Sequence, residues 1–267
     1  LMNKENLLKQ AKDEQFISGI HNYCDRWCER CPLTGRCMNF AIAEEEFSGP
    51  ESRDMGNALF WQKLSETFHT TLELVKELAE REGIDLDAID IEKHAARKAA
   101  DDELARNHRC CRMAMTYGAL VEEWFGAAEA NSAKRGDATG AQMQSYMPGG
   151  DVFGIKASCE EALEVIRWYQ HQIFVKLMRA VQGTLREEEE PFDTFTKDSD
   201  GSAKLALIGI ERSMGAWGEL RGFYFQKGPK MGDILLHLEG LRRNVEEVFP
   251  NARDFIRLGF DKVELNS

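Results

Sequence analysis

The chain has 267 residues, of which 43% are hydrophobic and 30% are charged, and its formal net charge is −12. This is the composition of a globular protein with enough apolar material for a core. Surfaces that bind duplex DNA or an anionic membrane are basic, so neither nucleic acid nor a membrane is expected as a partner. No run of about 18 uncharged apolar residues occurs, so no transmembrane helix is predicted.

The N-terminal residues 1–6 lead into a charged segment and lack the apolar core of a secretory signal. We therefore expect a cytoplasmic protein, in which thiols stay reduced. The chain contains seven cysteines, and four of them lie within residues 24–37. In a reducing compartment, such a cluster indicates a metal site in preference to disulfides.

In chain order, apolar residues first recur at helical spacing in the N-terminal half. A modest amphipathic helix is predicted from Asn3 to Tyr23, and a second helix from Cys37 to Phe47. A third is predicted from Met55 to Glu82, where Gly83 ends it, and a long fourth from Asp90 to Ala130. The stripe of the third helix consists of Phe60, Leu64, Phe68, Leu72, Val75 and Ala79.

Residues 132–157 are rich in the residues of turns and are predicted to form an irregular loop. The helical pattern returns from Ser158 to Glu189, and Ser158 with Glu161 fits a capping box at its start. Another helix is predicted to open at Asp198 and, after a turn at 226–230, a further one carries the stripe Ile234 to Val248. Pro250 is expected to open a short terminal helix.

No segment alternates polar and apolar residues over the length of a strand. The predicted fold is all-α, a bundle of five to seven helices whose short connections make neighbours antiparallel. Residues 1–50 are predicted to form an N-terminal segment that carries a four-cysteine, metal-binding helix-turn-helix. That segment would pack on a helical bundle formed by residues 51–267.

The cysteine cluster has the spacing C-x3-C-x2-C-x5-C, formed by Cys24, Cys28, Cys31 and Cys37. If the first part is helical, the first three share one face, and Pro32 turns the chain so that Cys37 completes the set. Four thiolates within 14 residues would repel one another. A bound cation removes this repulsion and keeps the thiols deprotonated.

Two metal centres fit four such ligands. A structural zinc takes four thiolates in a tetrahedron, usually from two C-x2-C pairs, of which this sequence has one. An iron–sulfur cluster also takes four thiolates and spreads them more widely. Arg26, Arg30 and Arg36 alternate with the ligands and could offset the negative charge of either centre, while Tyr23 and Trp27 could shield it from water.

The sequence Cys28-Glu-Arg-Cys31-Pro-Leu-Thr-Gly-Arg-Cys37 resembles the end of the [4Fe–4S] loop in DNA glycosylases of the endonuclease III and adenine-glycosylase type. That family ends its loop with C-x2-C-x5-C, often with Cys-Pro-Leu in the middle. The resemblance implies that Cys28, Cys31 and Cys37 are cluster ligands. The family's first ligand stands six residues before the second, whereas Cys24 stands three residues before Cys28. The likeness indicates a type of cluster and does not extend to DNA repair.

A second metal or small-molecule site is a further hypothesis, because helical bundles can hold metals between their helices. Glu211 lies among apolar residues and is expected to be buried, and a buried glutamate is paired, protonated or ligating. Glu211, His171, Asp233 and His237 could form this site if their three helices are neighbours. His108, Cys111, Cys159 and four tryptophans (Trp61, Trp124, Trp168 and Trp217) are expected to be core residues.

These patterns support three functions. The first is a redox or electron-transfer protein with a [4Fe–4S] cluster on the four cysteines and a protein docking or redox partner. The second is an interaction scaffold in which a structural Zn²⁺ joins the first two helices. The third is a helical metalloenzyme that uses the second site. The sequence predicts neither a substrate nor an oligomeric state.

Overall fold

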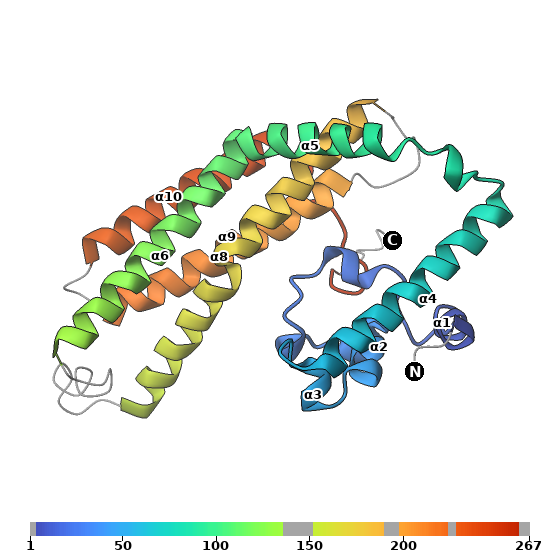
Figure 1. The fold of residues 1–267 in the computed structure, drawn as a ribbon. Coiled ribbons are helices and arrows are strands. Elements are labelled where there is room, and N and C mark those ends of the chain that lie inside the picture. The colour runs from blue at the N-terminus through green and yellow to red at the C-terminus, as the bar shows by residue number, and fades with distance from the viewer. Residues whose placement is uncertain (1–3, 136–151, 190–197, 224–227, 262–267) are drawn as a thin grey trace, which may run out of the picture. The chain divides into compact units, whose positions relative to one another are not determined.

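The computed structural model of the protein describes residues 4–135, 152–189, 198–223 and 228–261 (Figure 1). Throughout these residues the secondary structure is helical and no strand occurs, which confirms the predicted all-α class. The described residues form nine α-helices, where five to seven were predicted, because short helices near the N-terminus add to the long ones and one predicted long helix is divided.

The chain divides into two compact units, and the division falls inside one helix. Unit 1 comprises residues 1–97 together with residues 256–267, and unit 2 comprises residues 98–255. Unit 1 is therefore assembled from both ends of the chain. The predicted boundary after residue 50 stays a prediction, although the ring contact of Phe47 with Phe60, at 6.0 Å, joins the two sides of it.

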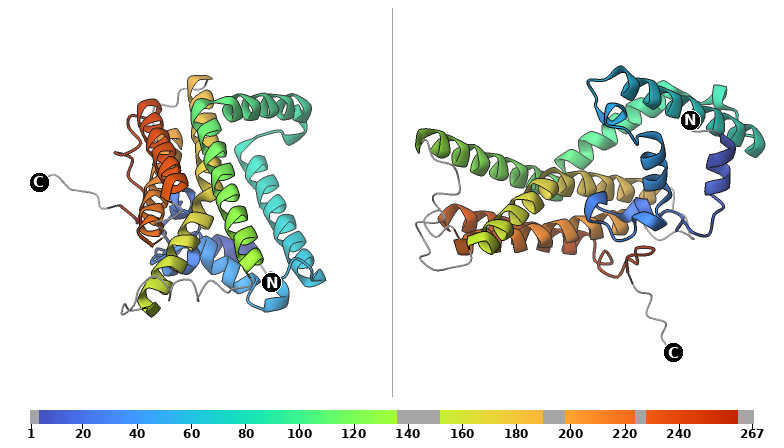
Figure 2. Two further views of the ribbon diagram at one scale, coloured as in Figure 1. Left: turned by 90° about the vertical axis from the view of Figure 1, so that its left-hand side faces the viewer. Right: turned by 90° about the horizontal axis from the view of Figure 1, so that it is seen from below.

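Unit 2 is built on four long helices that pack in a closed cycle (Figures 1 and 2). They are α6 (Arg109–Arg135), α8 (Val152–Glu189), α9 (Asp198–Phe223) and α10 (Gly228–Val248). Helix α8 packs on both α9 and α6, and α10 also packs on both α9 and α6. The contact between α8 and α9 is the most extensive. Each helix presents an apolar stripe to the centre, as the period of its sequence predicted.

The core of unit 2 is formed by large side chains that are almost completely buried. They include Ile166, Ile173 and Leu177 on α8, Leu207, Ile210 and Trp217 on α9, and Ile234, Leu238 and Leu241 on α10. Burying each such side chain contributes about 1.5–3 kcal/mol to the stability of the fold. The rings of Trp124 and Trp217 meet edge to face with their centroids 5.1 Å apart, so both tryptophans are core residues as predicted.

Glycine at position 209 permits the close approach of α9 to α8. A Cβ atom on Gly209 would lie 2.9 Å from Cδ1 of Tyr169 and 3.1 Å from Cγ1 of Ile173. Both distances are shorter than ordinary van der Waals contact between carbon atoms. The interface between α8 and α9 therefore depends on the absence of a side chain at this position.

The predicted helix from Asp90 to Ala130 is two helices, α5 (Ile91–Asn107) and α6. They are interrupted at His108, whose Nδ1 accepts a hydrogen bond from the backbone N–H of Cys110 at 3.2 Å. A side chain that bonds to the backbone in this way favours a helix start over a helix interior. The apolar pattern continues through the interruption, so period alone did not reveal it.

Unit 1 contains a different set of helices, most of them short (Figure 1). They are α1 (Lys4–Gln10), α2 (Met38–Glu46), α3 (Pro50–Arg53), α4 (Ala58–Glu82) and the first part of α5, with short 3₁₀ helices between them. Helix α4 begins where the Asn57 side chain accepts a hydrogen bond from the backbone N–H of Leu59. It ends at Gly83 in the left-handed conformation, as the sequence predicted.

Five other predictions differ from the structure in their bounds or in the element formed. The helix expected over Asn3–Tyr23 ends at Gln10, because turns take over from residue 11. Helix α8 begins at Val152, ahead of the capping box proposed at Ser158, and Pro250 opens turns instead of a helix. Of the predicted loop over 132–157, the flanks belong to α6 and α8, and residues 136–151 lie outside the described residues. Of the predicted turn at 226–230, residues 226–227 lie outside the described residues, and residues 228–230 belong to the start of α10.

Unit 1 has almost no apolar core. Among its described residues, the buried apolar side chains are those of Ile20 and Ala79. Helix α4 has the expected apolar stripe, but Phe68 is 66% exposed and Leu72 is 51% exposed. Trp61, which was predicted to be a core residue, is 57% exposed, and its indole N–H donates a hydrogen bond to the backbone oxygen of Met55. Hydrophobic burial among the described side chains therefore contributes little to the folding of unit 1.

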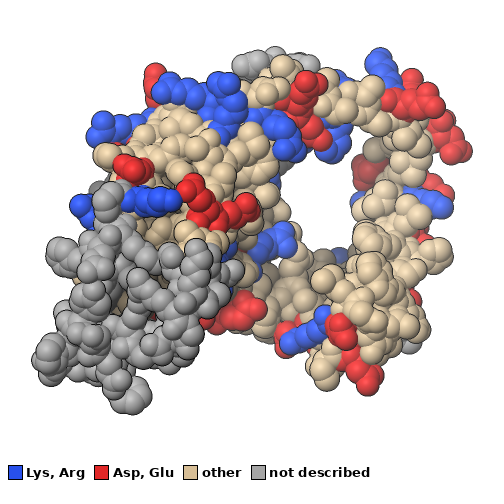
Figure 3. Space-filling model, turned by 60° about the vertical axis from the view of Figure 1, so that its left-hand side comes forward, with Lys and Arg blue, Asp and Glu red and all other residues tan. Residues whose placement is uncertain are grey.

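Charged side chains of both signs lie close to one another on the face of the molecule seen in Figure 3. In unit 2, Arg242 forms ion pairs with Glu239 at 2.9 Å and Glu246 at 3.0 Å. Such exposed pairs contribute about 0–1 kcal/mol each, so they matter more for solubility than for the fold. Among the described helices, none is long and apolar enough to cross a membrane.

The close approach at Gly209 yields a prediction for stability. Gly209→Ala should destabilise the protein by about 1–3 kcal/mol, because the new methyl group must displace Tyr169 or Ile173. Gly215 lies on the same helix, and a Cβ atom there would meet nothing within 4 Å. Gly215→Ala should therefore stabilise the protein by about 0.5–1 kcal/mol through helix propensity. Urea unfolding of both variants measures the difference, and equal effects would contradict the proposed close contact.

Candidate metal centre

The four clustered cysteines lie on a loop, so the condition under which Cys24, Cys28 and Cys31 would share a helical face is not met. The loop contains three 3₁₀ helices, which are η1 (Ile20–Tyr23), η2 (Cys28–Arg30) and η3 (Thr34–Arg36). Helices η2 and η3 end in the same way. The backbone N–H of Cys31 donates a hydrogen bond to the backbone oxygen of Cys28, and the backbone N–H of Cys37 donates one to the backbone oxygen of Thr34. Cys24, Cys31 and Cys37 each have extended backbone at the end of a turn. The cysteines are thus spaced by turns and do not share a helical face.

The base of this loop is closed by hydrogen bonds between residues 15–17 and 35–36. The backbone N–H of Ile17 donates to the oxygen of Arg36 at 3.0 Å. The side chain of Arg36 donates through Nε to the oxygen of Gln15 at 2.6 Å, and Nε2 of Gln15 donates to the oxygen of Gly35 at 3.2 Å. Three of the cysteines stand inside the closed loop, and Cys37 follows directly after it.

A tight turn between the first two cysteines directs both toward the same side. Oδ1 of Asp25 accepts a hydrogen bond from the backbone N–H of Trp27 at 3.2 Å. The residue between them, Arg26, has a φ of 60°, and it is the one non-glycine residue in the described chain with positive φ. Left-handed backbone at a residue with a side chain costs free energy and concentrates at functional sites. This strained turn is what brings Cys24 and Cys28 to one hollow.

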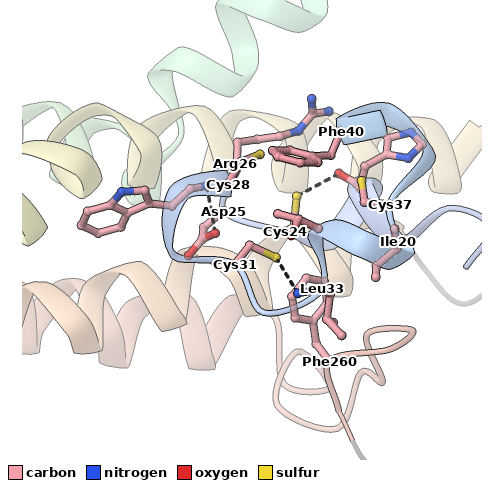
Figure 4. Close-up of a pocket in the computed structure, with 13 residues that line it drawn as sticks. Ile20, Cys24, Asp25, Arg26, Cys28, Cys31, Leu33, Cys37, Phe40 and Phe260 are labelled. Carbon is pink, nitrogen blue, oxygen red and sulfur yellow. Dashed lines mark hydrogen bonds between the residues drawn. The ribbon is translucent and has the colours of Figure 1, made fainter. Parts of the chain in front are cut away.

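All four cysteines line a single hollow in unit 1 (Figure 4). Its volume is about 330 Å³ when the space at its open mouth is included. In Figure 4, Phe40 lies on one side of the Cys24 sulfur, and Leu33 and Phe260 lie on the other. The remaining lining residues are Ile20, His21, Asp25, Arg26, Trp27 and Thr34. The thiols therefore face a partly apolar space.

The surroundings of Cys28 disfavour its ionisation. Partial burial raises the pKa of the Cys28 thiol above its ordinary value, and neighbouring groups raise it further. These neighbours are Cys24, Glu29, Cys31 and Cys37. None of the four loop cysteines is joined in a disulfide.

Backbone groups also contact the sulfur atoms. The N–H of Leu33 donates a hydrogen bond to Sγ of Cys31 at 3.4 Å, and Sγ of Cys24 donates to the oxygen of His21 at 3.4 Å. Cys37 is the N-cap residue of α2.

Arg30 and Trp27 cover the loop near Cys28. The guanidinium carbon of Arg30 lies 4.2 Å from the centroid of the Trp27 ring. A cation stacked on an aromatic face in this way is attracted by the ring. Trp27 lines the hollow, whereas Arg30 is not among its lining residues.

One wall of the hollow comes from the far end of the chain. Phe260 lines the hollow, although more than 220 residues separate it from Cys37 in the sequence. Sequence reasoning missed this residue. The signal available was a glycine followed by an aromatic residue in an otherwise unpatterned tail, which is too common to indicate a site.

The chemistry of the hollow fits a thiolate-bound metal centre. The loop supplies four sulfur donors and no competing disulfide. Among the described residues, however, no group of three or more histidine, cysteine, aspartate or glutamate side chains is placed so as to hold a single metal ion. A tetrahedral zinc needs all four sulfur atoms about 2.3 Å from one ion.

The structure does not bring the four residues of the predicted second site together. Glu211 is exposed, whereas burial was predicted. Its carboxylate forms an ion pair with Arg253 at 2.6 Å. Nε2 of His171 lies 3.8 Å from Glu122, and Nε2 of His237 lies 2.8 Å from the backbone oxygen of Met113. Asp233 is exposed. The hypothesis of a metal site at these residues thus finds no support in their positions.

The other three cysteines are buried in unit 2. Burial raises the pKa of Cys110 to about 11 and that of Cys111 to about 12, and it also raises the pKa of Cys159. Cys111 and Cys159 are core residues as predicted. Cys110 is buried as well, with its Sγ 3.1 Å from Oδ1 of Asn244 on α10.

His108 is half-buried. Burial is the larger cause that lowers the pKa of its imidazole, and the positive charge of Arg112 lowers it further.

Comparisons with known proteins provide no assignment for this site. The chain matches no protein-family model, no curated protein and no solved structure. Arguments about function therefore depend on the residues of the hollow themselves.

The two groups of cysteines should differ in reactivity. In metal-free protein, a thiol reagent such as DTNB should modify the four loop cysteines quickly and Cys110, Cys111 and Cys159 slowly. The reason is that the loop thiols are part-exposed, whereas burial keeps the other three protonated and inaccessible. The time course of thiolate release measures this, and a single rate for all seven cysteines would contradict the assignment.

The raised pKa values of Cys110 and Cys111 also predict a loss of stability at alkaline pH. Between pH 9.0, where the unfolded thiols ionise, and about pH 11, the folded thiols keep their protons. The free energy of unfolding should therefore fall with rising pH, by about 1.4 kcal/mol per pH unit for each thiol. A Cys110→Ala/Cys111→Ala variant should show a shallower fall in denaturant titrations. An unchanged slope would show that these thiols are not the cause.

Proposed function

We propose that the protein is an iron–sulfur protein in which Cys24, Cys28, Cys31 and Cys37 hold a [4Fe–4S] cluster that serves redox or electron transfer. One observation carries the proposal: four free cysteines from one short loop line the same hollow, and three of them oppose ionisation of the fourth. A bound cationic centre removes that opposition.

Two arguments favour a cluster over zinc. The sequence has one C-x2-C pair where zinc sites commonly use two. The sequence from Cys28 to Cys37 also resembles the cluster loop of the endonuclease III type of glycosylase.

A bound cluster would supply one-electron transfer chemistry, and the residues of the hollow would adjust it. The N–H of Leu33 donates to the sulfur of Cys31, and such bonds to cluster sulfurs raise the reduction potential. Ile20, Phe40 and Phe260 limit the access of water, which affects the potential as well. A protein that exchanges electrons needs a docking partner, which we expect to be another protein, and a reducing, cytoplasmic setting would keep the free thiols available.

A structural role for the centre is supported by the composition of unit 1. Ile20 and Ala79 are its buried apolar side chains among the residues described, and α4 exposes half of its apolar stripe. Small units without a core depend on metals, disulfides or oligomerisation for stability. The cysteines are free, so a metal is the stabilising element that the sequence itself provides.

This argument also supports the second candidate, an interaction scaffold with a structural Zn²⁺ on the same four cysteines. Zinc and cluster share the ligands and differ in colour, stoichiometry and redox activity. The third candidate, a helical metalloenzyme, would need a site beyond the cysteines. The separate partners of Glu211, His171 and His237 provide no basis for it.

Anaerobic purification tests the proposal. The protein should be brown, with broad absorption near about 400 nm and iron and sulfide in the protein fraction. Cys31→Ala should abolish the colour, because it removes one of four ligands. Cys159→Ala is the matched control: it removes a buried cysteine of unit 2 and should keep the colour. Thermal unfolding should show lower stability after metal removal, because metal binding is linked to folding.

The outcomes separate the candidates. Colourless protein with one equivalent of zinc, lost in Cys31→Ala and retained in Cys159→Ala, would replace the cluster by the zinc scaffold. Protein that binds neither iron nor zinc, from anaerobic preparation or after reconstitution, would refute both.

A further inference from the structure

We infer that residues 256–261, here called the C-terminal turn, form a cap over the proposed metal centre. In this cap Phe260 shields the cysteines, and Gly259 allows the turn to pack closely against the segment before the cysteine loop. The inference rests on the proposed function for the identity of the centre. The cap itself follows from contacts within unit 1, to which both the turn and the cysteine loop belong.

Gly259 lies against the segment that leads into the cysteine loop. A Cβ atom at this position would stand 2.8 Å from Cδ1 of Ile17 and 3.1 Å from Cδ1 of Ile20. Gly259 also has a φ of +79°, a conformation that residues with side chains rarely adopt. Both its backbone angle and its surroundings therefore require glycine.

Ile17 and Ile20 are themselves fixed to the cysteine loop. The N–H of Ile17 donates to the oxygen of Arg36, which closes the base of the loop. Ile20 is buried and lines the hollow together with Phe260. The turn thus packs on the residues that hold the loop closed, and its aromatic residue covers the cysteines from the side opposite Phe40 (Figure 4).

The C-terminal turn is held in shape by its own contacts. The backbone N–H groups of Phe260 and Asp261 donate to the oxygen of Arg257 at 3.1 and 3.0 Å. The Arg257 guanidinium pairs with the Asp261 carboxylate at 2.8 Å, and its carbon lies 5.1 Å from the Phe260 ring centroid. Both charged side chains are largely shielded, with 16% and 21% exposed. A turn held in this way presents Phe260 in a defined position.

The cap has a chemical consequence for a thiolate-bound centre. Water, oxygen and chelators reach a metal through open sides of its site, and apolar residues around the site control that access. Phe260 is an apolar residue in the lining of a partly open hollow. Removing the ring should speed the loss of the centre while leaving all four ligands in place.

The test compares variants of the full chain that differ within one turn. Phe260→Ala removes the shielding ring, whereas Leu258→Ala removes a side chain of the same turn that is 55% exposed and does not line the hollow. Metal-loaded protein is mixed with EDTA under argon, and the absorbance of the centre is followed in time. We expect loss about tenfold faster in Phe260→Ala than in wild type, and an unchanged rate in Leu258→Ala.

A second pair of variants tests the role of glycine. Gly259→Ala places a methyl group against Ile17 and should accelerate the loss in the same way. Gly35→Ala is the control, because Gly35 lies in the cysteine loop and a Cβ atom there meets nothing within 4 Å. Circular dichroism of each variant verifies that the helices remain, and Phe260→Leu should restore slow loss by replacing one apolar wall with another.

Reaction of metal-free protein with DTNB keeps this inference separate from the proposed function. The cap covers the cysteines with or without a metal, so Phe260→Ala should expose them to faster modification and Leu258→Ala should not. If wild-type protein binds no metal, the proposed function fails and the DTNB comparison still decides the cap. Equal DTNB rates, or equal rates of metal loss, in Phe260→Ala and wild type would overturn the cap.

Discussion

The constraint on which unit 1 depends is the convergence of four thiols on one hollow in a part of the chain that has scarcely any core. Thiolates repel one another, and the pKa of the Cys28 thiol is raised first by partial burial and then by neighbours that include the other three cysteines. The left-handed turn at Arg26 and the closed loop base between Ile17 and Arg36 shape the loop that carries them. Backbone strain persists only where the surroundings compensate for it, and the centre proposed above would supply that compensation.

The two units are stabilised in different ways. Unit 2 has four long helices with large buried side chains, and its close helix contact at Gly209 is typical of a well-packed interior. Unit 1 has short helices, loops and an exposed apolar stripe on α4. Unit 2 should therefore remain folded under conditions that unfold unit 1, and loss of a metal should affect unit 1 first. The centre proposed for unit 1 would then be lost without unfolding of unit 2.

The course of the chain brings distant segments together in unit 1. This unit contains residues from both ends of the chain, with all of unit 2 between them in the sequence. The close approach of Gly259 to Ile17 and Ile20 joins these segments, and closing so long a loop costs chain entropy that such contacts must offset. If the proposed centre binds, it would order the cysteine loop and with it the surface on which the C-terminal turn packs, so metal binding and closure of the chain would be linked.

The sequence by itself determined the all-α class, the end of α4 at Gly83 and the four cysteines as a candidate site, because helical period, glycine capping and cysteine spacing are local properties. It did not determine the loop around the cysteines: spacing of three and four residues suggested a helical face, whereas 3₁₀ turns and the left-handed Arg26 position the thiols. The burial of Glu211 and Trp61 was also misjudged, since an apolar neighbourhood in sequence does not show which helix faces lie against other elements. Phe260 joined the site only through tertiary structure, because contacts between distant segments depend on how the whole chain packs and leave no periodic signal in either segment.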